Sequence, residues 1–135
     1  MAFIPTVYAE TNSYTDDFSR EVVGDLVIQR VNLSRATSKE AQIFRDKILY
    51  DILRNNLKII IDLSICEYID STFLGALVIA LKKISERGGE IKYVIPKPEA
   101  LYLLKITGLY GVLNLYRTSE DAVDSFNYPS IESLE

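Results

Sequence analysis

Three consecutive polar residues, Asp70, Ser71 and Thr72, interrupt a long apolar part of the sequence. The nearly unbroken apolar stretch KIIIDLSICEYI precedes them, and FLGALVIAL follows them. A hydroxyl or carboxylate directly before an apolar helical run is typical of a helix N-cap, because the first N–H groups of a helix have no intrahelical acceptor. Capping by Asp70 or Ser71 is therefore one explanation of the triplet.

A regulatory site at Ser71 is the second explanation. A helix that follows a central strand begins at the carboxyl edge of the sheet, where α/β folds tend to place their sites. Phosphorylation of Ser71 would add roughly −1.5 to −2 charges beside Asp70 and beside the free amide donors of the helix. A partner surface fitted to a neutral hydroxyl would bind this anionic patch less tightly. The triplet thus predicts a binding switch.

The segments before the triplet follow strand, helix and strand patterns. Residues 21–31 are typical of two short strands or one bent hairpin, with a turn at Gly24 and Asp25. A capping box at residues 37–40 opens a helix in which apolar residues recur at helical spacing. Residues 58–63 are β-branched and continuously apolar, which predicts a central strand covered on both faces.

The segments after the triplet continue the alternation. The helix that starts there ends at residues 88–89, two glycines that follow a basic last turn, and residues 90–95 form a strand. A short helix over residues 97–106, a brief strand near residues 113–116 and a last helix from Ser119 complete the chain. This order predicts an α/β fold with a mixed central sheet of about four to five strands and about four helices.

The length of 135 residues fits one domain with its own hydrophobic core. Residues 1–19 are expected to be a polar N-terminal extension, within which the stretch FIPTVY is also compatible with an edge strand. Residues 20–127 form the expected domain, and residues 128–135 the C-terminal tail.

Composition argues against several classes of function. The net charge of −4 and the pI of about 4.9 argue against a nucleic-acid binder, which would need clustered Lys and Arg. The chain has no histidine, which removes Ser-His-Asp and Cys-His catalysis and zinc sites built on imidazole. No glycine motif of a phosphate-cradling nucleotide site occurs. We therefore expect no catalytic residues, no cofactor and no metal.

The single cysteine, Cys66, excludes an intramolecular disulfide and suits a reducing compartment. Its expected role is that of a small buried apolar side chain. The start MAFIPTVYAE lacks the pattern of a signal peptide, and FLGALVIAL is far shorter than the roughly 20 apolar residues that cross a bilayer. These features predict a cytoplasmic protein without membrane insertion.

Two stretches, DLSICEYIDSTFLGALVIALKKISERGGEIKYV and ITGLYGVLNLYRTSEDAVDSF, resemble the STAS domain of bacterial anti-sigma factor antagonists. The mark of that family is an Asp-Ser-Ser/Thr-x-Leu-Gly step after a central strand, here residues 70–75, and the similarity extends from about Val22 to Phe126. The resemblance implies a STAS-like fold. It also implies that the serine directly after the aspartate, Ser71, is the phosphorylation site, with Thr72 as the weaker candidate.

The same resemblance implies the partners. In the family, a protein that is both anti-sigma factor and serine kinase, with a GHKL-type ATPase fold, phosphorylates the antagonist, and a PP2C-type phosphatase removes the phosphate. The unphosphorylated antagonist captures the kinase and so frees the sigma factor. Partner contacts are then expected at Asp70, Ser71, Thr72, Phe73 and Ala76.

Two parts of the helix after the triplet leave alternatives open. Phe73 stands where the family usually has glycine, and on a helical wheel it lies at the border of the core stripe, so it either packs in the core or contacts a partner. Ala76, Ile79 and Ala80 widen the apolar face, which indicates either a doubly covered helix or a docking surface, and the family resemblance favours docking.

Three functions compete at this stage. The first is a phosphorylation-switched antagonist of a kinase-type anti-sigma factor. The second is a STAS scaffold that does not switch and works in a signalling assembly or as a subunit of a transport system. An enzyme is the third and weakest, because a lone serine without a nearby base is a poor nucleophile.

Overall fold

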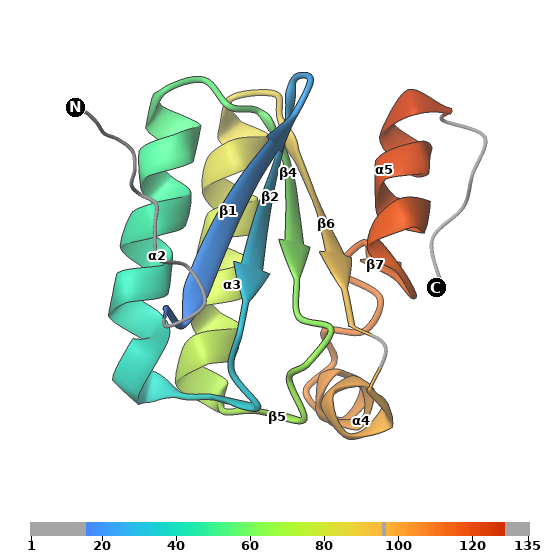
Figure 1. Cartoon of the computed structure of the whole chain (residues 1–135). Helices are drawn as coiled ribbons and strands as arrows, with labels where there is room; N and C mark the ends of the chain where they lie inside the picture. Colours follow the sequence, from blue (N-terminus) through green and yellow to red (C-terminus); the bar gives the residue numbers. More distant parts are fainter. Residues whose placement is uncertain (1–15, 96, 129–135) are drawn as a thin grey trace.

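A computed structural model of the chain describes residues 16–95 and 97–128, in which strands and helices alternate (Figure 1). The elements are, in chain order, β1 (Phe18–Val23), β2 (Leu26–Val31), β3 (Arg35–Ala36), α2 (Ser38–Leu53), β4 (Lys58–Asp62), β5 (Tyr68–Ile69), α3 (Ser71–Glu86), β6 (Glu90–Val94), α4 (Pro98–Ile106), β7 (Leu115–Tyr116) and α5 (Ser119–Asn127). The predicted order is confirmed, with two additional short strands, β3 and β5. The edge strand considered for FIPTVY lies outside the described residues.

The central sheet has five strands in the order β1-β2-β4-β6-β7. β1 and β2 form an antiparallel hairpin, whereas β2, β4, β6 and β7 pair in parallel, so the predicted mixed sheet is confirmed. The hairpin turn lies at Gly24, whose φ of +62° is a conformation that glycine adopts without strain. β1 begins at Phe18, which places the last two residues of the expected extension in the sheet.

Helices cover both faces of the sheet (Figure 1). α2 and α3 lie on one face and close the larger core, to which Ile59 and Ile61 of β4 contribute. α5 lies on the other face, over a smaller core that contains Ile60 of the same strand. All three isoleucines are buried, which explains why residues 58–63 read as a continuous apolar run.

α2 and α3 pack closely against each other as well as against the sheet. The capping box of α2 is present, because the Thr37 N–H donates to Oε1 of Glu40 at 3.0 Å. In α3, Ala76 and Ala80 are buried, although they lie beside the stripe that faces the sheet. Ala76 and Ala80 therefore belong to a doubly covered part of the helix, whereas Ile79 is half-buried, and docking along this face stays a prediction.

A two-stranded parallel sheet, β3 with β5, joins the segments that lead into α2 and α3. Ala36 pairs with Ile69, and each helix begins two residues after these positions, at Ser38 and at Ser71. Because the paired strands end at the same level, the helices that follow them also begin at the same level. The first turns of α2 and α3 are thereby held next to each other.

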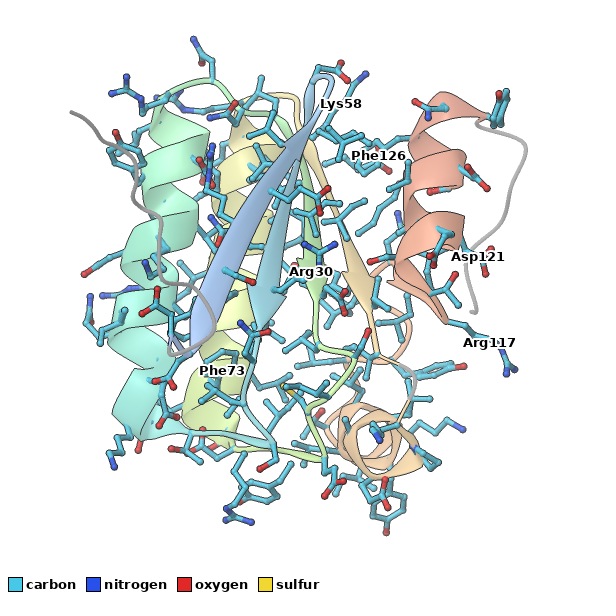
Figure 2. All side chains as sticks on the ribbon, viewed as in Figure 1. Arg30, Lys58, Phe73, Arg117, Asp121 and Phe126 are labelled. Carbon is cyan, nitrogen blue, oxygen red and sulfur yellow. The ribbon has the colours of Figure 1, made fainter. Side chains whose placement is uncertain are left out.

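Polar contacts connect α5 to the sheet. The helix begins at Ser119, as expected, and its N-cap is Thr118. The hydroxyl of Ser119 instead donates to Oδ2 of Asp62 at 3.0 Å, at the end of β4. The Lys92 ammonium lies 4.2 Å from the centre of the Phe126 ring, which points toward the sheet in Figure 2. None of the described helices is both long and apolar enough to cross a bilayer.

Candidate functional site

The carboxylate of Asp70 caps two helices at once. Its Oδ1 accepts a hydrogen bond from the Phe73 N–H at 2.8 Å, inside the first turn of α3. Its Oδ2 accepts one from the Ser38 N–H at 2.7 Å, at the first residue of α2. The Asp70 N–H donates to the carbonyl of Ala36 at 3.0 Å. Asp70 is therefore the N-cap of α3, and the capping role does not fall to Ser71.

Ser71 and Thr72 are the first two residues of α3, and both are exposed. They lie at the end of the molecule toward which the arrowheads of β2, β4 and β6 point (Figure 1). This is the carboxyl edge of the parallel strands, where the sequence predicted the start of the helix. The hydroxyls thus stand at a surface where N–H groups of the helix end and the Asp70 carboxylate are neighbours.

Phe73 belongs to the core. Its side chain has 0% exposed surface, and its ring centre lies 4.8 Å from that of Phe44 on α2, which in turn lies 5.7 Å from the ring of Phe18 on β1. Figure 2 shows Phe73 between the helices and the sheet. The expectation that Phe73 contacts a partner is therefore corrected. Its ring anchors the first turn of α3 while its N–H binds Asp70.

A groove of about 300 Å³ runs between α2 and α3 and reaches the hydroxyl pair. It is lined by Ser38, Ala41, Gln42 and Arg45 from α2 and by Ser71, Thr72, Gly75, Ala76 and Ile79 from α3. Ala76 is part of the wall but is only 5% exposed. The groove therefore brings Ser71 and Thr72 together with a charged residue of its wall, Arg45.

Tyr68 and Arg35 form an exposed pair next to the site that the sequence did not indicate. Tyr68 on β5 lies two residues before Asp70 and is 42% exposed. The guanidinium carbon of Arg35, its partner across the short sheet, lies 4.3 Å from the ring centre. Two-residue strands carry no periodic signal, so no sequence pattern indicates that these residues pair.

Cys66 fits the structural role expected for it. The side chain is buried, and burial together with the nearby Asp62 carboxylate raises the pKa of the thiol to about 12. A thiol that stays protonated is a poor nucleophile. Within residues 16–95 and 97–128, no three side chains of the metal-ligating types Cys, Asp and Glu gather closely enough to hold a metal ion.

Comparison with known proteins identifies the family. The family model of the STAS domain matches residues 23–122 of this chain, and the chain belongs to the STAS domain family. A Thermotoga maritima protein provisionally named an anti-sigma factor antagonist is 32% identical over 108 residues. The match covers 79% of this chain and 95% of that protein.

Solved structures agree with this assignment. A crystal structure of a protein from Thermotoga maritima with the same provisional name is 27% identical, with a TM-score of 0.75, over 86% of this chain and 99% of that one. The unphosphorylated form of the anti-sigma factor antagonist SpoIIAA is 18% identical, with a TM-score of 0.66, over 82% of this chain and 98% of its own. The second likeness concerns the fold alone.

Proposed function

We propose that this protein is a phosphorylation-switched anti-sigma factor antagonist. In its unphosphorylated form it captures an anti-sigma factor that is also a serine kinase of the GHKL type, and the sigma factor is released. The observation that carries this proposal is the place of Ser71, an exposed hydroxyl in the first turn of α3, directly after the residue that caps the helix. A modification at this hydroxyl leaves the Asp70 cap in place.

The proposed reaction is a phosphoryl transfer from ATP. The Oγ of Ser71 attacks the γ-phosphorus of an ATP bound to the kinase, and a new oxygen–phosphorus bond forms. The bond from that phosphorus to the oxygen bridging the β- and γ-phosphates breaks, and ADP leaves. The hydroxyl proton goes to a base of the kinase. Thr72 is the alternative acceptor, and a PP2C-type phosphatase returns the hydroxyl by hydrolysis with water.

Electrostatics explains how the phosphate would change binding. A phosphoserine carries roughly −1.5 to −2 charges at neutral pH. At position 71 this charge stands beside the Asp70 carboxylate, and together they make a concentrated anionic patch. The N–H groups at the start of α3 favour an anion at this place, so the helix itself tolerates the modification. The fold therefore stays intact while the surface offered to a partner becomes more negative and changes shape.

The surface around Ser71 has the composition of a binding surface. Tyr68 and Arg35 form an exposed aromatic and cationic pair next to it, and both residue types are enriched where proteins bind one another. We include this pair with Asp70, Ser71 and Thr72 in the proposed partner surface. Phe73 lies beneath it, and Ala76 lies in the wall of the adjoining groove.

The relatives support a role in binding and switching. The Thermotoga maritima relative is provisionally named an anti-sigma factor antagonist, and SpoIIAA has been solved in both an unphosphorylated and a phosphorylated form. A regulatory binding protein of this kind works without a cofactor and without turnover of its own. We place its action in the cytoplasm, where sigma factors, the kinase and ATP meet.

A phosphorylation assay tests the proposal. The purified chain is incubated with ATP and the serine-kinase anti-sigma factor of the same genome, and the phosphate is mapped by peptide mass spectrometry. We expect the phosphate at Ser71 and its loss in Ser71→Ala. Ser85→Ala, which removes an exposed hydroxyl at the far end of α3, is the matched control and should be phosphorylated normally. Phosphorylation that persists in Ser71→Ala/Thr72→Ala would refute the assignment of the site.

A further inference from the structure

The groove between α2 and α3 is lined by a guanidinium group that has no role in the proposed switch as described so far. Among the described residues that line the groove, Arg45 is the one that is charged, and the others have small, apolar, hydroxyl or amide side chains. Ser71 and Thr72 line the same groove. A cation and a candidate phosphate acceptor thus share one cavity of about 300 Å³.

The hydrogen bonds of Arg45 are incomplete. Its Nη2 donates to Oε1 of Gln42 at 3.1 Å. Its Nε is buried and has no acceptor, and in residues 16–95 and 97–128 it is the single buried side-chain nitrogen or oxygen in that condition. A buried donor without an acceptor is unfavourable, and more so when the group is charged. Arg45 as a residue lines the groove, so its Nε can take an acceptor there once the side chain turns toward the groove.

The orientation of the Arg45 side chain indicates at which end of the groove an acceptor would bind. Side chains of a helix lean toward its N-terminus, and the bond from Arg45 back to Gln42 follows this direction. The N-terminus of α2 is Ser38, whose N–H is bonded to Asp70, the residue before Ser71. Arg45 therefore extends along the groove toward the first turn of α3.

We propose that Arg45 is the internal receptor for a phosphoryl group on Ser71, an inference that rests on the proposed phosphorylation of that residue. The planar fork of a guanidinium, with Nε and one Nη in parallel, matches two oxygens of a phosphate. Nε is the donor that lacks an acceptor in the unmodified chain. The phosphate completes the hydrogen bonds of Arg45 and occupies the mouth of the groove, between the first turns of α2 and α3.

This contact changes what phosphorylation does to the surface. A phosphate held by Arg45 has one fixed position and a partly neutralised charge, and it closes a groove that the unmodified chain leaves open. The charged groups around it are Arg45 in the wall, the Asp70 carboxylate beside Ser71, and Lys39 and Glu40 in the first turn of α2. Glu40 is engaged in the capping box of Thr37. Of the two cations, Arg45 lines the groove and Lys39 is not among its lining residues, so Arg45 is placed to bind the phosphate from within.

Phosphorus NMR of a chain made with phosphoserine at position 71 tests this inference without any kinase. Phosphoserine is incorporated during translation, and the second pKa of the phosphate is measured by a ³¹P titration. An adjacent cation favours the dianion and lowers this pKa from its usual value of about 6. We expect Arg45→Gln to raise the phosphate pKa by about half a pH unit, because the cation is lost. Arg45→Lys, which keeps the charge without the fork, should recover part of the difference.

Arg54→Gln is the matched control, because Arg54 lies at the other end of α2, over the ring of Tyr50. It should leave the phosphate pKa unchanged. Circular dichroism of every variant checks that the fold is retained, and the Tm of each is compared with and without the phosphate. We expect the phosphate to raise the Tm of the parent chain more than that of Arg45→Gln.

An equal phosphate pKa in the parent chain and in a folded Arg45→Gln variant would overturn the inference. The outcome is independent of the proposed function, since no partner takes part in the titration. If Arg45→Gln changes the phosphate pKa but the kinase does not phosphorylate the chain, the role of Arg45 is supported and the proposed switch is refuted. If the kinase phosphorylates Ser71 but Arg45→Gln leaves the phosphate pKa unchanged, the switch is supported and the role of Arg45 is refuted.

Discussion

Asp70 and Ser38 lie 32 positions apart in the sequence, yet a carboxylate oxygen of the first accepts a hydrogen bond from the backbone N–H of the second at 2.7 Å. The other oxygen of the same carboxylate binds inside the first turn of α3. One side chain therefore fixes the relative position of two helix starts. The proposed phosphorylation site, Ser71, is the next residue along the chain. Its hydroxyl therefore lies on a surface whose position is fixed by the hydrogen bonds of Asp70.

Removal of the Asp70 carboxylate should destabilise the protein. Asp70→Ala deletes acceptors for two backbone N–H groups, and the loss of a helix cap alone lowers the free energy of unfolding by about 0.5–2 kcal/mol. We expect Asp70→Ala to lie at the upper end of this range, and Asp70→Asn, with one oxygen left, to lose less. Urea denaturation measures both. Equal stability of Asp70→Ala and the parent chain would contradict the double cap.

Replacement by alanine should change the free energy of unfolding strongly at Phe73 and hardly at Ser71. Phe73→Ala removes a fully buried ring that packs on Phe44 and should lower the free energy of unfolding by about 3–5 kcal/mol. Ser71→Ala removes an exposed hydroxyl that caps nothing and should change it by no more than about 0.5 kcal/mol. Thermal or urea unfolding followed by circular dichroism separates the two. A small effect of Phe73→Ala would mean that its ring is not part of the core.

Gly75 should tolerate alanine with a gain in stability. It lies inside α3, where glycine is less favourable than alanine by about 0.8–1 kcal/mol, and a Cβ added to it meets no atom within 4 Å. Gly75→Ala should therefore raise the free energy of unfolding by up to about 1 kcal/mol while it narrows the groove. The same denaturation experiment measures this. A clear loss of stability would show that the groove is closed against an added methyl group.

Cys66 should make the stability depend on pH in the alkaline range. Burial raises the pKa of its thiol to about 12 from a reference value of 9.0, so the native thiol stays protonated where the unfolded one ionises. The unfolded state then releases the proton first. The free energy of unfolding should be unaffected below about pH 9 and should fall as the pH rises from there toward 12.

Urea midpoints measured between pH 8 and pH 11 for the parent chain and for Cys66→Ala isolate this contribution. Tyr93, whose pKa is also raised by burial, acts in the same range but is common to both proteins. The parent chain should lose stability faster with pH than the variant. Parallel curves would contradict the burial of the thiol.

Much of the fold follows from local sequence signals. The apolar spacing of Phe44 and Ile48, the capping box at Thr37 and the strand pattern of residues 58–63, of which 59–63 are buried, each specify an element and the face it buries, and all are confirmed. The cap at Asp70 is also local. The family resemblance to STAS domains is confirmed by the family match over residues 23–122.

The rest of the site depends on contacts between distant segments. The short sheet of β3 with β5, the bond of Asp70 to Ser38 and the place of Arg45 in the groove join residues that lie about 30 positions apart and carry no shared period. Phe73 lies at the border of the core stripe on a helical wheel, and contacts with other elements, among them the ring of Phe44 on the neighbouring helix, bury it. The periodicity of one helix does not predict contacts with segments that are distant in the sequence.

The affinity of the chain for its kinase-type anti-sigma factor, measured by calorimetry with and without a phosphate on Ser71, tests the central claim most directly. Phosphoserine at position 71 is compared with the unmodified chain and, as a control, with phosphoserine at position 85, at the far end of α3. The account predicts that the phosphate at Ser71 weakens binding by about a hundredfold, equivalent to roughly 2.7 kcal/mol, and that the phosphate at position 85 leaves it unchanged. Equal affinities of the unmodified and the Ser71-phosphorylated chain would contradict the switch and favour a STAS scaffold that does not respond to phosphorylation.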